Sequence, residues 1–71
     1  MAITGAALQA ALGTKETNAK VVHEFGVVGT FQEWYVVGNG DAPGRERLVR
    51  TTASHNAATQ AAAVLTALRA N

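Results

Sequence analysis

The sequence predicts an α+β fold in which a short N-terminal helix and an alanine-rich C-terminal helix pack on one face of a three-stranded antiparallel sheet. Side chains through the middle of the chain alternate with a period of two, which is typical of strands. Apolar residues near both ends recur instead at helical spacing. With 71 residues the chain has room for a single domain, residues 1–71.

The first expected element is the short N-terminal helix. Thr4 can cap it, because a threonine hydroxyl accepts a hydrogen bond from a free amide of the first turn. Leu8, Ala11 and Leu12 then share one face, and the helix is expected to end at Ala11 or Leu12. Gly13 suits the left-handed conformation that often follows a last helical turn. The polar stretch beyond it is expected to be a connection.

Two strands joined by a tight turn are expected next. The stretch KVVHEFGVV, residues 20–28, alternates with a period of two and predicts the first strand. Gly29 and Thr30 offer a tight reversal, and FQEWYVV, residues 31–37, predicts the second. The side chains of this second strand divide into Phe31, Glu33, Tyr35 and Val37 on one face and Gln32, Trp34 and Val36 on the other.

A loop and a third strand complete the expected sheet. GNGDAPGR, residues 38–45, contains three glycines and the only proline, which predicts a loop longer than a two-residue hairpin turn. A phosphate-binding loop is a weaker interpretation, because the stretch lies between strands and lacks the Lys-Ser/Thr ending. ERLVRTT, residues 46–52, predicts the third strand.

The last element is the alanine-rich helix. Ser54, or Thr52 just before it, is expected to cap this helix. Alanine has the highest helix propensity, and its small side chain lets a helix approach a sheet closely. The apolar positions expected to face the sheet are Ala58, Ala61, Ala62, Leu65 and Leu68.

Composition excludes several classes of protein. The chain has no cysteine and only two histidines, so we expect no disulfide, no structural metal site and no cofactor. A net charge of +1 from scattered residues gives no electrostatic attraction for nucleic acid or anionic lipid. No apolar run approaches the roughly 20 residues of a membrane span. We therefore expect a soluble, unprocessed protein, intracellular or associated with a virion.

The order of elements and the pattern S-x-x-x-A-x-x-A-A-A, residues 54–63, resemble the double-stranded-RNA-binding domain, a family with an α-β-β-β-α fold. The resemblance covers nearly the whole chain as a layout. In that family a basic cluster at the start of the last helix holds phosphates, but His55, Asn56 and Thr59 stand at those positions here. The family's first hairpin loop usually carries Gly-Pro-x-His, whereas residues 26–30 read GVVGT. The resemblance implies the fold more strongly than RNA binding.

No residues form a convincing catalytic set, so we expect no enzyme. His23 and Glu24 are adjacent on a strand and point to opposite faces, while a meeting of His23 with Glu33 depends on the strand register. Ser54 beside His55 lacks a third, orienting group and is more readily explained as a helix cap.

A surplus of apolar side chains is the most informative feature for function. If both helices cover one face of the sheet, the other face receives either Val21, Phe25, Phe31 and Tyr35 or Val22, Val28, Trp34 and Val36. Neither set is typical of a solvent-exposed face. We therefore expect an interface with another copy or a protein partner, in an accessory component of a larger assembly such as a phage particle. Its expected residues are Phe25, Phe31, Trp34, Tyr35 and Val36.

The alternative hypothesis is a module that binds nucleic acid in the manner of the double-stranded-RNA-binding domain. Arg45, Arg47 and Arg50 form the only local basic concentration, and Lys15 would assist them. Asp41 and Glu46 lie among these arginines, which favours instead a solvated edge strand that resists wrong pairing.

Overall fold

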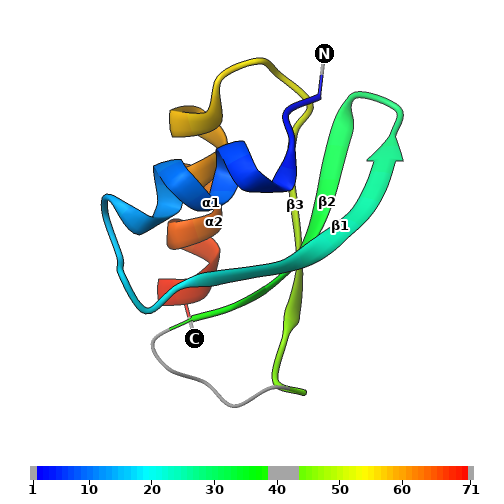
Figure 1. Ribbon diagram of the computed structural model, residues 1–71. Helices are drawn as coiled ribbons and strands as arrows, with labels where there is room; N and C mark the ends of the chain where they lie inside the picture. Colours follow the sequence, from blue (N-terminus) through cyan, green and yellow to red (C-terminus); the bar gives the residue numbers. More distant parts are fainter. Residues whose placement is uncertain (1, 39–43, 71) are drawn as a thin grey trace.

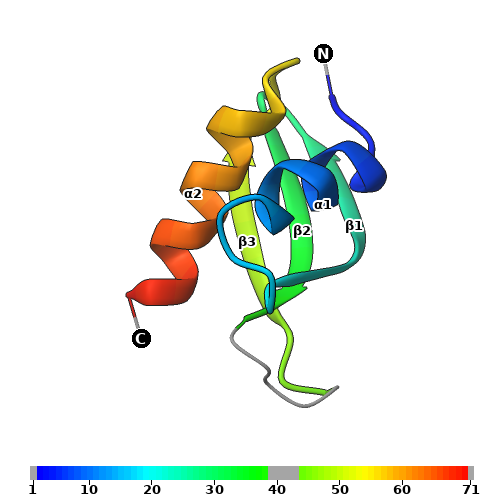
Figure 2. The same ribbon diagram turned by 60° about the vertical axis from the view of Figure 1, so that its left-hand side comes forward.

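A computed structural model describes residues 2–38 and 44–70. Its elements are α1 (Gly5–Gly13), β1 (Lys20–Val28), β2 (Phe31–Val37), β3 (Arg47–Thr52) and α2 (Ala57–Arg69). The strands form one antiparallel sheet in the order β1-β2-β3. Both helices lie on the same side of this sheet, α1 over β1 and α2 over β3 (Figures 1 and 2). The expected α+β fold is confirmed.

Helix α1 begins as its sequence predicts and ends slightly later. The Thr4 hydroxyl accepts a hydrogen bond from the Ala7 amide at 3.1 Å, and Leu8 and Leu12 are buried. Gly13 is the last helical residue, and it lacks the positive φ that its position suggested. The cap is Thr14, whose φ of −71° is right-handed and whose hydroxyl donates to the Ala11 carbonyl at 2.7 Å.

Strand β1 contains two irregularities, which the alternating pattern did not predict. The register shifts between Val21 and His23 and again between Glu24 and Gly26, so Val22 and Phe25 are extra residues relative to β2. As a result Val21 lies opposite Val36, on the side of the helices, whereas His23 lies opposite Tyr35, on the other side. The expectation that Val21 shares a face with Phe25 is therefore wrong.

The turn between β1 and β2 is formed as expected. Gly29 has φ +61°, a left-handed conformation that glycine adopts without steric cost. The predicted loop over residues 38–45 lies largely outside the described residues, and so does Asp41.

Helix α2 starts later than predicted. Its N-cap is Asn56, whose Oδ1 accepts from the Thr59 amide at 3.0 Å, so the expectation that Ser54 or Thr52 caps it is wrong. The Ser54 hydroxyl instead accepts from the Asn56 amide at 3.3 Å. The buried face also differs from the expected one: Gln60, Ala61, Val64, Leu65 and Leu68 are buried, while Ala58 and Ala62 are exposed, so the expectation that these two alanines face the sheet is wrong.

A polar cluster lies inside the core between α2 and the sheet. Gln32, Thr51 and Gln60 are each at most 3% exposed. Gln60 Oε1 accepts from Trp34 Nε1 at 3.0 Å and from the Thr51 hydroxyl at 2.8 Å, and its Nε2 donates to Gln32 Oε1 at 2.9 Å. No buried side-chain nitrogen or oxygen of the described residues lacks a hydrogen-bond partner.

The Gln32 amide also fixes the segment before α1. Its Nε2 donates to the Ile3 carbonyl at 2.7 Å and to Glu24 Oε2 at 2.6 Å, and its Oε1 accepts from the Ile3 amide at 3.2 Å. The start of the chain is therefore joined to the centre of the sheet by a pair of bonds like those between two strands.

Candidate interaction surface

The side of the sheet away from both helices is uncovered, and we call it the open face. Cα pairing and ring contacts assign to it His23, Phe25, Val28, Phe31, Glu33, Tyr35, Leu48 and Arg50. Four of these are large apolar side chains with substantial exposure: Phe25 at 55%, Val28 at 49%, Leu48 at 47% and Phe31 at 39%. An antiparallel sheet with one solvated face ordinarily carries polar side chains there.

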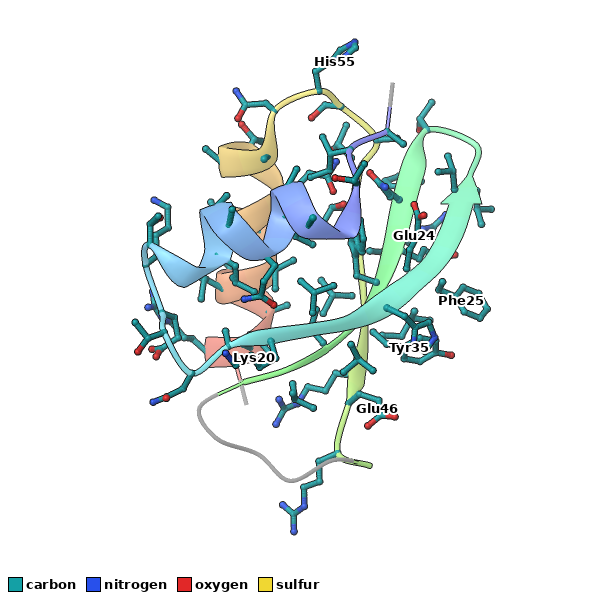
Figure 3. All side chains as sticks on the ribbon, in the orientation of Figure 1. Lys20, Glu24, Phe25, Tyr35, Glu46 and His55 are labelled. Carbon is teal, nitrogen blue, oxygen red and sulfur yellow. The ribbon has the colours of Figure 1, made fainter. Side chains whose placement is uncertain are left out.

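Tyr35 is the centre of an aromatic cluster on the open face. The His23 ring lies 4.8 Å from the Tyr35 ring, between centroids, at an interplanar angle of 44°. The Phe25 ring meets Tyr35 edge-on, at 5.3 Å and 85°. Figure 3 shows Phe25 and Tyr35 close together on the side of the sheet opposite the helices. Such rings supply rigid contact area that loses little conformational entropy when a partner binds.

Charged side chains interrupt this apolar surface at one place. The Arg50 guanidinium carbon lies 4.1 Å above the centroid of the Phe31 ring. Glu33, half-buried, is the Cα partner of Arg50 on the neighbouring strand. Arg50 stacks on Phe31 instead of pairing with Glu33, and neither charged group forms a hydrogen bond or ion pair with the described residues.

Trp34 and Val36 do not belong to this surface, and their expected role in the contact is wrong. Both are fully buried beneath the helices, because their strand positions point to the opposite face from Phe31 and Tyr35. Phe25, Phe31 and Tyr35 do lie on the open face. Leu48 and Val28 complete the apolar patch, and the alternation of β3 about the buried Val49 would have identified Leu48.

The basic residues of the alternative hypothesis do not form one patch. Arg47 and Arg50 are three positions apart on β3, so they belong to opposite faces of the sheet. Arg45 is exposed before that strand. Lys15 belongs to the connection between α1 and β1, and this segment lies on the helical side of the sheet (Figure 1).

The side chains considered for catalysis are also separated. The register places His23 opposite Tyr35, and Glu33 lies opposite Gly26. Glu24 points to the helical side and bonds Gln32, while His55 is exposed on the segment before α2 (Figure 3). Within residues 2–38 and 44–70 there is no cluster of three potential metal ligands, and no pocket was found. No helix in this part of the chain has the length and hydropathy needed to span a membrane.

The sequence matches no protein-family model, and no curated protein or solved structure shows significant similarity to it. Any functional conclusion therefore rests on the residues of the open face.

Proposed function

We propose that this chain is a non-catalytic structural or interaction protein that contacts a protein surface through the open face. One observation carries the proposal: Phe25, Val28, Phe31 and Leu48, all substantially exposed, lie on the same face of one sheet. Clustered apolar side chains on a small protein usually mark an interaction site, and aromatic residues are preferred anchors in such sites.

The energetic consequence of covering this face is considerable for a chain of this size. Fully burying an apolar side chain as large as phenylalanine or leucine is worth about 1.5–3 kcal/mol. The exposed parts of the four apolar side chains would together supply a few kcal/mol, before the cost of ordering the partners. The proposed role is self-assembly or docking on a larger assembly, for example as an accessory component of a phage particle.

Protection of the open face in native material tests the proposal. Hydroxyl-radical footprinting of the protein isolated within its native assembly, compared with the dilute purified chain, should show reduced labelling of Phe25, Phe31 and Leu48. Two valines of β1 with similar exposure are internal controls. Val22, 45% exposed, is a bulge residue, and Val27, 50% exposed, lies on the helical side. Equal labelling of the open face in both samples would contradict the proposal.

The second candidate is a nucleic-acid-binding module that resembles the double-stranded-RNA-binding domain. The α-β-β-β-α layout with a three-stranded antiparallel sheet favours it. Binding through Arg45, Arg47, Arg50 and Lys15 should weaken steeply as salt is added, because it depends on phosphate neutralisation. Fluorescence anisotropy with duplex RNA over a salt series, repeated with Arg47→Glu and Arg50→Glu, tests it. An apolar interface should instead persist or strengthen with salt.

A further inference from the structure

We infer that the occupant of the open face is a second copy of this chain, positioned by two reciprocal ion pairs between Glu33 of one copy and Arg50 of the other. This inference rests on the proposed function, since it requires the open face to be an interface. It adds the identity of the partner and the feature that sets its orientation.

The two charged groups are adjacent and remain unpaired within one copy. Glu33 and Arg50 are Cα partners on β2 and β3, which ordinarily allows a cross-strand ion pair. The guanidinium is instead held over Phe31 at 4.1 Å. A guanidinium stacked by its face keeps its in-plane N–H donors available, and these match the two oxygens of a carboxylate.

This arrangement is self-complementary. In a two-fold symmetric dimer, if residue i of one copy contacts residue j of the other, then j also contacts i. An axis midway between the Glu33 carboxylate and the Arg50 guanidinium places each group on its opposite in the second copy. Both ion pairs then form by one symmetry operation, and the charges of Glu33 and Arg50 are neutralised together.

Pairing in this way also removes the main cost of covering the face. Burying an isolated charge in an apolar interface is expensive, whereas a paired and hydrogen-bonded charge is tolerated. An uncharged apolar partner would bury Glu33 and Arg50 without compensation. A second copy supplies the opposite charge at each position together with the matching apolar side chains.

The size of the molecule is compatible with such a dimer. A standard interface buries about 800 Å² on each partner, which is about a fifth of the accessible surface of 4103 Å². The open face is one side of a molecule that measures 30 × 22 × 21 Å. Two sheets packed face to face at about 10 Å form the core of many sandwiches.

Charge exchange tests the inference. We expect sedimentation equilibrium of the purified chain to show a dimer at protein concentrations of about 10–500 μM, the range in which an association with a micromolar Kd is detected. Glu33→Arg brings two arginines together at each contact, and Arg50→Glu brings two glutamates together. Each single variant should weaken self-association at least about tenfold, because like charges face each other in the interface.

Two combinations should restore association. An equimolar mixture of E33R and R50E should form a heterodimer, and the double variant E33R/R50E should form a homodimer, both with affinity within about tenfold of the original. The matched controls are Glu16→Arg and Lys15→Glu, which make the same charge changes in the connection after α1, across the sheet from the open face. Both controls should leave the dimer intact, and far-UV circular dichroism checks that every variant is folded.

A monomeric wild-type chain throughout this range would overturn the inference, and so would a dimer that neither single charge reversal weakens. If the footprint nevertheless shows the open face protected in native material, the proposed function stands and the second copy is the wrong partner. If the footprint shows no protection, the proposed function itself fails.

Discussion

The Trp34 indole is bonded to helix α2 by Gln60: Trp34 Nε1 donates to Gln60 Oε1 at 3.0 Å, and both side chains are at most 1% exposed. The same oxygen accepts from Thr51 on β3, so one amide joins two strands to the helix. Gln60 thus determines how α2 sits on the sheet behind the open face.

Replacing Gln60 with leucine should strongly destabilise the protein. The change keeps a similar volume but leaves the Trp34 N–H buried without an acceptor and removes the Nε2 donor to Gln32 Oε1 and to the Ser54 carbonyl. A buried polar group that loses its partner costs about 1–3 kcal/mol. We expect urea denaturation to show a decrease of about 2–4 kcal/mol in the free energy of unfolding. Thr59→Ala, at an exposed site on the same helix, is the control and should change it by less than about 0.7 kcal/mol. Equal effects would show that the amide network contributes nothing.

The residue that caps α2 can be identified by a pair of alanine substitutions. Asn56→Ala removes the acceptor for the Thr59 amide and should lower the free energy of unfolding by about 1 kcal/mol. Ser54→Ala removes only the longer contact at 3.3 Å and should have less than half this effect. Thermal unfolding followed by circular dichroism measures both, and the reverse order would restore Ser54 as the cap.

Two glycines should respond in opposite directions to the same substitution. Gly29→Ala forces a side chain into a left-handed turn conformation and should cost about 1 kcal/mol. Gly13→Ala occupies a right-handed helical position with no atom near the added Cβ, so it should stabilise by about 0.5–1 kcal/mol. Urea denaturation of the two variants checks the difference, and destabilisation by Gly13→Ala would contradict the helical assignment.

The emission of Trp34 should be independent of assembly. It is the only tryptophan, and it is buried beneath the helices on the side of the sheet opposite the open face. We expect blue-shifted emission and weak acrylamide quenching at both low and high protein concentration. A quenching constant that falls as the protein concentration rises would place the association surface near Trp34 rather than at the open face.

The element order and much of β1 and β2 follow directly from sequence periodicity, because period-two and helical spacings reflect where side chains point. Gln32, Trp34 and Val36 do share a face, as their alternation indicates, and that face is buried. The choice between the two faces could not be made from the pattern. It depends on where the helices pack, and both faces carry apolar residues.

Other features of the fold could not be predicted from the sequence pattern, for physical reasons. A bulge adds one residue without changing the local composition, so no apolar spacing marks Val22 or Phe25 as extra. The start of α2 depends on which of several capping residues is used. Gln60 could have been placed in the core from its spacing of four from Val64, because a buried amide is tolerated when its bonds are satisfied.

The two bulges determine where strand β1 can lose a residue without exchanging its faces. Each extra residue reverses which side of the sheet the following residues face, so Val21 and His23 occupy opposite sides although they are two apart. A deletion of Val22 would join Val21 directly to His23 and restore regular alternation, so His23 would still lie opposite Tyr35, whereas a deletion outside the two bulges would exchange the two sides. We therefore expect strand β1 to tolerate a one-residue deletion at Val22 better than one at a paired position, because only the latter exchanges buried and exposed side chains.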